Sequence, residues 1–478
     1  MIPSTLLRRI TISKRCLSTV AIDRLGLGGS KWRSSQYPLL VQTAVQQGIS
    51  CIEAGTEGGD AALAQILEKE MPRKIQCLLR VGYRSVAEAE TGTEEIHGNF
   101  FPGDVVVEKN RVLHNIGPNY LDYALTQSPL MKLAEQYPDH LELVVLLHNP
   151  EVQKNHNLQD QKDETLAHQL SESCRELQRL VRESPLHSYG IVSNGFSLPP
   201  THPLHLSWLH HVAPALQQDT PDFCVVQFPY NLLEHSDFLK SKKDAPAHIQ
   251  YYAMRPLSCY PDRGTSTSHP FVLRDYLLPA TMNKNDPLQW THQMTGLPEA
   301  YQVALKAAMA HFDAEEILEL KSQGIELDTD QRETLDGCKL MQSLLHDVDA
   351  GLDRVRSYAA HEEFLLQQVI PLIHDTFESY DEDTAKVLEA FFGAFNLAVK
   401  YSIAKNVRHL LIHGEDGGGD SPKYPVPDDM RLQEFALRHV WKEKGIDKII
   451  VGASDPDQIV DFVNIGKKLE AEGSSLYE

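Results

Sequence analysis

The chain has 478 residues, of which 42% are hydrophobic and 23% charged, a composition typical of a globular protein with a large core. Its formal charge of −21 argues against nucleic acid or an anionic membrane as a main partner. No apolar run approaches the roughly 18 residues needed to span a membrane. The seven cysteines show no CxxC spacing, so neither a metal site nor a disulfide framework is indicated.

The first 22 residues differ in composition from the rest of the chain. They contain four basic residues and several Ser and Thr, and the first acidic residue is Asp23. A cationic, hydroxylated segment of this kind predicts a mitochondrial transit peptide, and Arg15-Cys16-Leu17-Ser18 resembles a processing site with cleavage after Leu17. We therefore expect residues 1–17 to direct the protein to the mitochondrial matrix. A chloroplast address, or a disordered basic tail on a cytoplasmic protein, is the alternative.

After this leader, short apolar runs alternate with helical patterns. The runs are Leu25–Gly28, Ile49–Glu53, Ile75–Val81, Leu141–His148, Ser188–Ser193, Phe223–Pro229, Ile249–Met254 and Lys448–Gly452. The helical patterns are Gln36–Gln47, Asp60–Glu70, Pro118–Tyr137, Thr165–Glu183, Pro203–Gln218, Arg431–Lys444 and Asp457–Lys468, with a shorter candidate at Ser236–Ala245. Eight strands alternating with helices predict an α/β fold, the (β/α)8 or TIM barrel, rather than a doubly wound sheet.

Two segments interrupt the alternation. Residues 84–114 read as a loop with one strand-like piece, Val105–Glu108. The longer interruption, 259–427, follows the seventh strand; its first part, Pro261–Pro298, reads as irregular, and the spacing from Pro298 to about Val407 predicts four or five helices. We therefore expect a barrel formed by residues 23–258 and 428–478, with a mostly helical insertion between these two parts.

The insertion is strongly acidic. Residues 301–400 contain 20 Asp and Glu against 8 Lys and Arg. A solvated helical surface is the simpler explanation, and a docking face for a basic protein partner is the alternative. The glycine-rich run Gly414–Asp420 then predicts a flexible linker. Metal binding is the alternative, which the lack of ordered ligand spacing in this run disfavours.

A histidine ends the fourth predicted strand. Five apolar residues, Leu143–Leu147, precede His148, and barrels of this class place their chemistry at the carboxyl ends of their strands. The alternative is a hydrogen-bonded histidine that only closes the strand.

Seven segments in order, this strand among them, resemble the aldo-keto reductases, a family of NADPH-dependent oxidoreductases built on a (β/α)8 barrel. The other six are Leu25-Gly26-Leu27-Gly28, Gly48–Gly55, Gly190-Ile191-Val192-Ser193-Asn194, Val225–Leu233, Met254-Arg255-Pro256-Leu257 and Ile449–Ser454. The resemblance covers about residues 23–257 and 428–468. It implies reduction of an aldehyde or ketone, with a small-molecule carbonyl compound as the substrate.

The resemblance implies a catalytic set of tyrosine, lysine, aspartate and histidine, in which the lysine lowers the pKa of the proton-donating tyrosine. His148 matches the histidine, Arg80 stands at the lysine and Glu53 at the aspartate, whereas the tyrosine position is Gly58. Glu53 and Arg80 together predict a buried ion pair. Tyr83, just beyond the third strand, is the alternative source of a hydroxyl, and otherwise an ordinary loop tyrosine.

The resemblance also implies a cofactor site at the strand ends. Ser193, Asn194 and Gln227 match residues that hydrogen-bond the nicotinamide carboxamide, a role that suits side chains with donors and acceptors. Each could instead cap a strand end. Met254 replaces the tyrosine that stacks on the nicotinamide, and Arg255 is a candidate ligand of the pyrophosphate or a cap on a loop carbonyl.

The adenine end of that site departs from the family. Gly452 and Ser454 match its loop, but no basic residue stands there, and Asp455 and Asp457 would repel a phosphate. Phe462 replaces an asparagine that often contacts adenine. These changes favour NADH over NADPH, or no dinucleotide.

Two functions follow from these residues. One is a weak or altered NAD(P)H-dependent reductase; the other is a catalytically inactive barrel that serves as a nucleotide-sensing or protein-binding scaffold. Because the insertion leaves the barrel after its seventh strand, we expect it either to cover the cofactor site or to replace part of it.

Overall fold

A computed structural model describes most of the chain. The described residues are 23–29, 37–55, 59–70, 74–85, 105–108, 111–113, 116–152, 163–216, 221–234, 237–259, 271–274, 289–355, 358–376, 381–413, 424, 426–427 and 430–474. The predicted transit peptide, Gly58 and the linker Gly414–Asp420 lie outside these residues, so the predictions made for them stay predictions.

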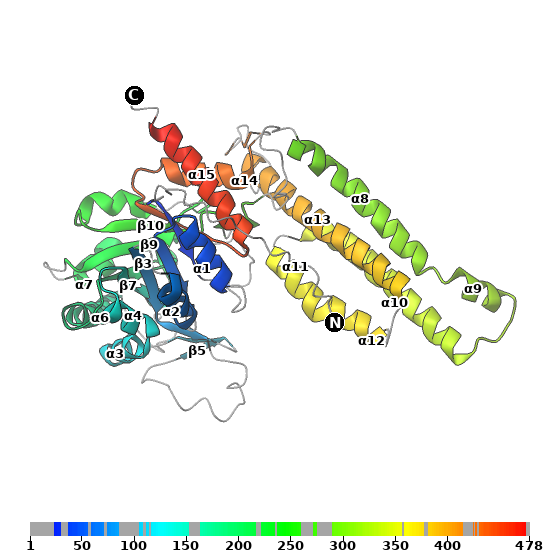
Figure 1. Cartoon of the computed structure of the whole chain (residues 1–478), viewed down its shortest axis with the longest axis horizontal. Helices are drawn as coiled ribbons and strands as arrows, with labels where there is room; N and C mark the ends of the chain where they lie inside the picture. Colours follow the sequence, from blue (N-terminus) through cyan, green and yellow to red (C-terminus); the bar gives the residue numbers. More distant parts are fainter. Residues whose placement is uncertain are drawn as a thin grey trace.

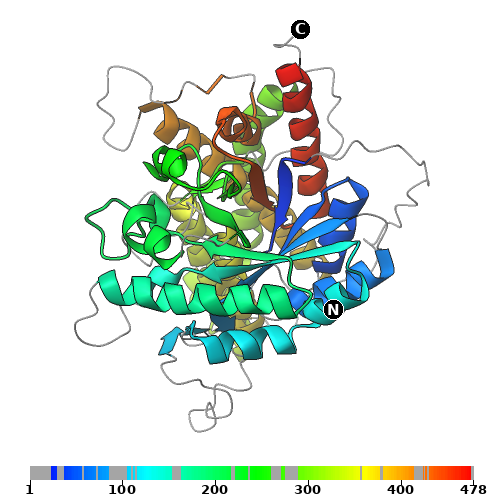
Figure 2. The same ribbon diagram turned by 90° about the vertical axis from the view of Figure 1, so that its left-hand side faces the viewer.

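Eight parallel strands close into a barrel, as predicted. Their order around the barrel is β1-β13-β10-β9-β8-β7-β3-β2. Figure 2 shows the strands at the centre, with helices around them. The strands are β1 (Leu25–Gly28), β2 (Cys51–Gly55), β3 (Ile75–Val81), β7 (Leu141–His148), β8 (Ser188–Val192), β9 (Phe223–Pro229), β10 (Gln250–Met254) and β13 (Lys448–Gly452). Each predicted strand differs from the observed one by at most two residues at either end, because continuous apolar runs are typical of strands buried on both faces.

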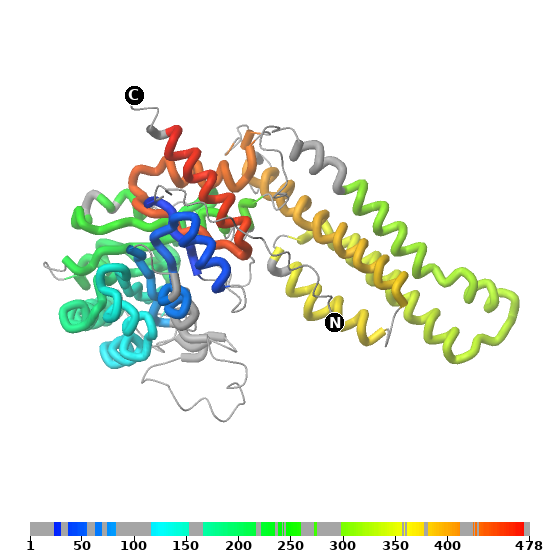
Figure 3. Tube along the Cα trace, in the orientation of Figure 1, coloured from blue at the N-terminus to red at the C-terminus, as the bar shows by residue number. Residues whose placement is uncertain are grey.

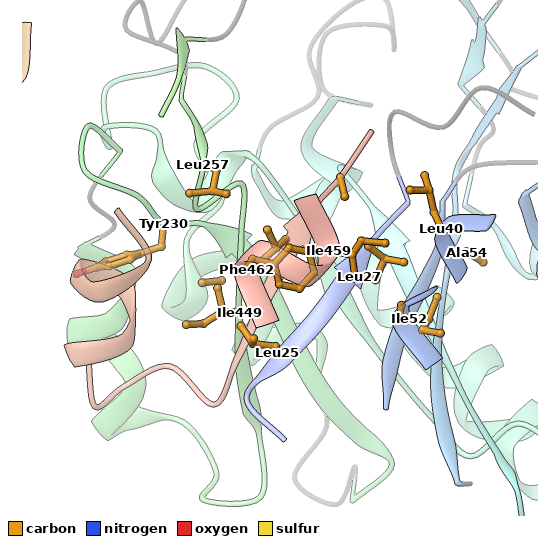
Figure 4. Packing of buried hydrophobic residues seen from close by; sticks show 14 of the residues in the cluster. Leu25, Leu27, Leu40, Ile52, Ala54, Tyr230, Leu257, Ile449, Ile459 and Phe462 are labelled. Atoms are coloured by element: carbon orange, nitrogen blue, oxygen red, sulfur yellow. The ribbon is translucent and has the colours of Figure 1, made fainter. Parts of the chain in front are cut away.

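Helices cover the outside of the barrel. They are α1 (Tyr37–Gln46), α2 (Gly59–Glu70), α3 (Pro118–Gln127), α4 (Pro129–Gln136), α6 (Asp163–Glu183), α14 (Leu432–Lys442) and α15 (Pro456–Ser474). Figure 4 shows how this layer packs: Ile459 and Phe462 of α15 lie against Leu25 and Leu27 of β1 and Ile449 of β13. Phe462, fully buried, is therefore a residue of the barrel's core.

Three predicted helices differ in the structure. The pattern Pro118–Tyr137 forms two helices, α3 and α4, because Ser128 is extended before Pro129. The pattern Pro203–Gln218 shrinks to a π turn, η5 (Trp208–Val212), followed by one turn of α-helix, α7 (Ala213–Ala215). The candidate Ser236–Ala245 is a 3₁₀ helix, η6 (Asp237–Asp244).

Two small sheets stand outside the barrel. β4 (Tyr83–Ser85), β5 (Val105–Glu108) and β6 (Arg111–Leu113) form an antiparallel sheet after β3, and β5 matches the strand-like piece of the sequence. The other sheet pairs β11 (Ser258–Cys259) with β12 (Phe271–Val272) directly after β10.

The segment between β12 and α14 forms a helical bundle beside the barrel (Figures 1 and 3). It contains α8 (Gln289–His311), α9 (Glu315–Ser322), α10 (Thr329–Gly351), α11 (Tyr358–Phe364), α12 (Ile370–Thr376) and α13 (Glu382–His413). A π turn, η8 (Leu365–Val369), joins α11 to α12. The prediction that the chain is irregular up to Pro298 was wrong at its end, since α8 begins at Gln289 and contains Pro298.

The bundle has its own apolar core. Among the described residues, one helix is long and apolar enough to cross a membrane by length and composition, Glu382–Leu411 of α13. Its buried side chains include Phe391, Phe395 and Val399, and the first two are in ring contact with Tyr301 of α8. The apolar character of α13 is thus used in packing within the bundle.

Candidate active site

Three predicted residues meet inside the barrel. Glu53 of β2, 1% exposed, accepts hydrogen bonds at Oε2 from Arg80 Nη2 at 2.7 Å and from Gln227 Nε2 at 2.9 Å. Its Oε1 accepts from the backbone N–H of Gly29 at 3.2 Å. Arg80 Nη2 also lies 3.6 Å from the sulfur of Met254. The predicted ion pair between Glu53 and Arg80 is present, and Gln227 and Met254 adjoin it.

The ion pair lies near the carboxyl ends of the strands. Along β7, Val144 and Leu146 belong to the apolar cluster inside the barrel, whereas Val145 and Leu147 face the helices. Strand alternation therefore places His148 on the interior side, two residues beyond Leu146. Leu146 is paired in register with Arg80. His148 thus lies above the level of the ion pair.

His148 and Gln227 stand at the same level of the barrel. Both are in register with Val192, on the strand between them, so their Cα atoms are about 10 Å apart at the usual strand spacing. Gly82 follows β3 at a φ of +127°, and a Cβ there would lie 3.1 Å from the carbonyl oxygen of His148. A glycine is required at this position beside the histidine.

The amide of Gln227 has one unused group. Because a carboxylate only accepts, the nitrogen of this amide must face Glu53, which fixes the orientation of the side chain. Its Oε1 is buried, and no donor among the described residues reaches it. Buried acceptors in proteins nearly always have a donor, so this oxygen is suited to receive one from a ligand.

Ser193 and Asn194 lie in the turn that follows β8. Ser193 is fully buried, and its Oγ accepts from Gly195 N at 2.8 Å, as in a turn-closing serine. The backbone N–H of Asn194 donates to Oδ1 of Asn149, whereas its side chain makes no capping bond. Glu151, 1% exposed, accepts from Gly195 N at 3.0 Å and holds the same turn. The Ser193 oxygen accepts within the turn and keeps its O–H as a donor, and the Asn194 side chain takes no part in capping the turn.

Arg255 forms an ion pair with a residue that the sequence did not single out. Its Nη2 donates to Oε1 of Glu234 at 2.7 Å, and Glu234 is buried. Asn231 bonds to both members of the pair: its Nδ2 donates to Glu234 Oε2 and to the backbone carbonyl of Arg255, and also to the carbonyl of Ser258. Arg255 has a φ of +57°, a left-handed conformation that these contacts fix. The guanidinium is therefore partly neutralised before any phosphate arrives.

The loop after β13 is closed by its own side chains. Asp455 Oδ1 accepts from Gln458 N, and Gln458 Oε1 accepts from Ser454 N, so the start of α15 is capped from within the loop. Gly452 is exposed, with no heavy atom within 4 Å of the place a Cβ would take. This loop offers a phosphate neither a base of its own nor an uncapped helix N-terminus.

A base reaches this loop from the insertion. Arg274, two residues after β12 and 6% exposed, donates from Nη2 to the carbonyl oxygen of Gly452 at 3.0 Å. The backbone N–H of Leu273 donates to Leu257 O at 2.9 Å, which ties the same segment to the end of β10. The start of the insertion thus bridges β10 and β13 at their carboxyl ends. This is where we expected the insertion to cover the cofactor site or to replace part of it.

Several residues of this site could not be found from the sequence. Glu151, Asn231, Glu234 and Arg274 bond backbone groups or other side chains across distances that only the folded chain sets. One signal was present: Asn231 and Glu234 are three residues apart just after a buried strand, a spacing that suits a side-chain turn. Among the described residues, no group of three or more His, Cys, Asp or Glu side chains could hold a metal ion.

The chain resembles known proteins in its fold and not detectably in its sequence. No family model and no curated protein matches the chain. Among solved structures it is similar to an aldo-keto reductase from Bacillus halodurans in its holo form, at 11% identity and a TM-score of 0.38, over 92% of this chain and 86% of that one. It is also similar to MGS-M4, an aldo-keto reductase from a Medee basin deep-sea metagenome library, at 12% identity and a TM-score of 0.28, over 86% of this chain and 96% of that one. The closed order of eight parallel strands establishes the (β/α)8 barrel independently of these similarities.

Proposed function

We propose that the protein is an NAD(P)H-dependent oxidoreductase of aldehydes or ketones whose proton-transfer step is weak or altered. The observation that carries the proposal is the buried Oε1 of Gln227, at the level of His148, which no donor among the described residues reaches. A primary carboxamide such as that of nicotinamide has an N–H₂ group that would satisfy it. The side chain of Asn194, at the end of the neighbouring strand, supports the same reading.

The residues fit the two ends of such a cofactor unequally. Gln227, Asn194 and the hydroxyl of Ser193 would hold a nicotinamide, which when bound supplies a hydride. Arg255, paired with Glu234, and the acidic loop after Gly452 fit the phosphates poorly. We therefore propose weak dinucleotide binding, with NADH favoured over NADPH because no base in this loop would pair with a 2′-phosphate.

The roles of the interior residues follow from their charges. Arg80 keeps a fixed positive charge beside Glu53, and His148 above it is the candidate to orient a carbonyl oxygen. Arginine does not lose its proton at ordinary pH, so Arg80 can stabilise a developing negative charge but cannot donate the proton. With glycine at position 58, turnover would depend on His148 or on water as the proton source.

A scaffold without catalysis is the second candidate. It is favoured by the ion pair between Arg255 and Glu234 and by the contact of Arg274 with Gly452. In both contacts a basic side chain near the carboxyl ends of the strands bonds to the protein itself, so it is less available to a cofactor. A barrel of this kind would bind a nucleotide or a protein without reducing a substrate.

Cofactor binding separates the two candidates. Titration of the purified protein with NADH and NADPH, followed by fluorescence quenching, should show binding of NADH that weakens roughly tenfold in Gln227→Leu, since one buried hydrogen bond is lost. Gln250→Leu, at the opposite end of the barrel, should bind as the natural protein does. No binding of either dinucleotide at millimolar concentration would exclude the reductase.

Turnover is the second step of this test. If NADH binds, slow reduction of nitrobenzaldehyde should be lost in His148→Ala and should rise in Gly58→Tyr, which restores a phenol as proton donor. Binding without any turnover, in the natural protein and in Gly58→Tyr alike, would favour the nucleotide-sensing scaffold.

A further inference from the structure

The helix formed by α11, η8 and α12 lies along the lower edge of the bundle in Figure 1. We call this segment, Tyr358–Thr376, the edge helix. The side chains it buries include His361, Val369 and Ile373, so only a narrow stripe faces the bundle. Most of its circumference is therefore accessible to a partner.

Large apolar side chains stand on the accessible side of the edge helix. Leu366 is 51% exposed and Ile370 41% exposed, and residues four apart lie above one another on a helix. Pro371, also exposed, adjoins Ile370, and Phe364, 38% exposed, lies two residues before Leu366 and so on a different side of the helix. Single exposed hydrophobic residues are common, whereas several within two turns indicate an interaction surface.

The π turn in the middle of this helix contributes to that arrangement. The N–H of Ile370 bonds to the carbonyl of Leu365, five residues earlier, so one extra residue is accommodated between the two ends of the helix. Val369 and Ile373 still face the bundle, while Leu366 and Ile370 face solvent. Such π turns occur often at functional sites.

Acidic residues precede and follow this apolar surface along the chain. Residues 358–389 contain eight Asp and Glu and a single Lys. Glu363 and Asp375 are exposed on the edge helix itself. Glu382 and Asp383, at the start of α13, are 85% and 84% exposed and share the one Lys of this stretch, Lys386, at 2.9 and 3.5 Å. The exposed acids of the edge helix itself are therefore the ones available to a basic partner. A second copy of the same face would meet like charge, so self-association through this face is disfavoured.

We propose that the edge helix docks a cationic amphipathic helix of a separate polypeptide. The apolar face of the partner would cover Leu366 and Ile370, and its basic residues would pair with the acids on either side. Electrostatic attraction would speed the encounter, and burial of the apolar side chains would hold the complex. This surface is independent of the barrel and of the function proposed for it.

A synthetic amphipathic helix of leucine and lysine is a suitable probe. Its binding to the full-length protein, followed by fluorescence anisotropy, should give a Kd on the order of 10 µM at low salt and should weaken as salt is added. Leu366→Ser and Ile370→Ser should each weaken it roughly fivefold to tenfold. Both residues are about half exposed, so these variants should fold, which circular dichroism would check.

Leu318→Ser is the matched control. Leu318, on α9, is 42% exposed and flanked by Glu316 and Glu319, but it has no second large exposed apolar residue within four positions. The proposal requires binding to this variant to stay unchanged. It would be overturned if Leu318→Ser weakened binding as much as Leu366→Ser, if a leucine–glutamate helix bound equally well, or if the probe did not bind at all. A dimer that dissociates in Leu366→Ser, seen by analytical ultracentrifugation, would equally overturn it in favour of a second copy.

Discussion

Two charged residues inside the barrel form an ion pair, and the arginine in it limits what the pair can do chemically. Glu53 and Arg80 bond directly, and Gln227 shares the same carboxylate oxygen. The guanidinium offers several N–H groups where an ammonium offers a compact point charge, so it can bond Glu53 and still reach Met254. The pair stabilises the barrel's interior and keeps a positive charge beneath His148.

Removal of one partner of this pair should be costly. Glu53→Ala would leave Arg80 buried without its carboxylate, and the free energy of unfolding in urea should fall by about 3 kcal/mol. The double variant Glu53→Leu with Arg80→Met should lose less than the sum of the two single changes, because no charge is then left unpaired.

The ion pair of the exposed Lys74 with the partly buried Glu142 provides the control for this cycle. Lys74→Ala should change the free energy of unfolding by less than about 1 kcal/mol. Additive losses in the Glu53 and Arg80 variants would show that the two residues stabilise the barrel separately.

At the scale of elements, the strands were predictable and several connections were not. β3 and β7 are buried on both faces, and their apolar runs end at residues that the sequence alone identifies. The chain between β8 and β9 has helical spacing but forms only η5 and α7, because Pro214 and the surrounding packing limit the helix. Local pattern determines an element buried on all sides better than one whose length depends on its neighbours.

The residues of the site differ in the same way: contacts between strand residues were predictable, and contacts made by loop residues were not. Glu53, Arg80 and Gln227 lie on strands, so that alternation and register brought them together as expected. Arg274 lies in a segment with little regular structure, and its contact with Gly452 depends on how β12 pairs with β11. The sequence therefore predicted which strand residues face the interior, but not which loop groups would reach them.

The contact of Arg274 should hold the start of the insertion to the barrel. Arg274→Ala removes the donor to Gly452 O, and amide hydrogen exchange at Gly452–Asp455 and at Leu273 should become roughly tenfold faster. The global melting temperature should change little, because the strands are untouched.

Arg332→Ala is a suitable comparison, since the exposed Arg332 guanidinium pairs with the exposed Glu326 at 3.4 Å. Its exchange pattern at β13 should match that of the natural protein. Unchanged exchange in Arg274→Ala would mean that the pairing of β11 and β12 alone keeps the segment in place.

For the whole molecule, the bundle and the barrel have different electrostatic characters. The bundle carries much of the negative charge of the chain on its surface, yet it buries a histidine. His361 Nε2 lies 2.7 Å from Asn396 Oδ1, and its ring meets those of Phe395 and Tyr358. Burial lowers the pKa of His361, while the Asn396 bond and Glu362 oppose the shift and Lys400 adds to it.

This histidine should make the bundle sensitive to acid. Because the pKa of His361 is lower in the folded state than its ordinary value of about 6.5, the unfolded chain binds more protons at lower pH, and stability rises with pH below about 6.5. Its contribution is fully present above that pH and decreases as the pH falls, by up to about 1.4 kcal/mol per pH unit. Thermal unfolding monitored at pH 7.5 and 5.5 should show a lower melting temperature for the bundle at pH 5.5.

His361→Gln should flatten this dependence, since glutamine keeps a hydrogen-bond donor for Asn396 but has no proton to gain. Because the chain has 22 histidines, the informative quantity is the difference in slope between the two proteins. An equal slope in both would assign the acid sensitivity to groups other than His361. A smaller slope in His361→Gln, with the barrel's near-ultraviolet signal unchanged, would place the sensitivity in the bundle and show that it can loosen while the barrel stays folded.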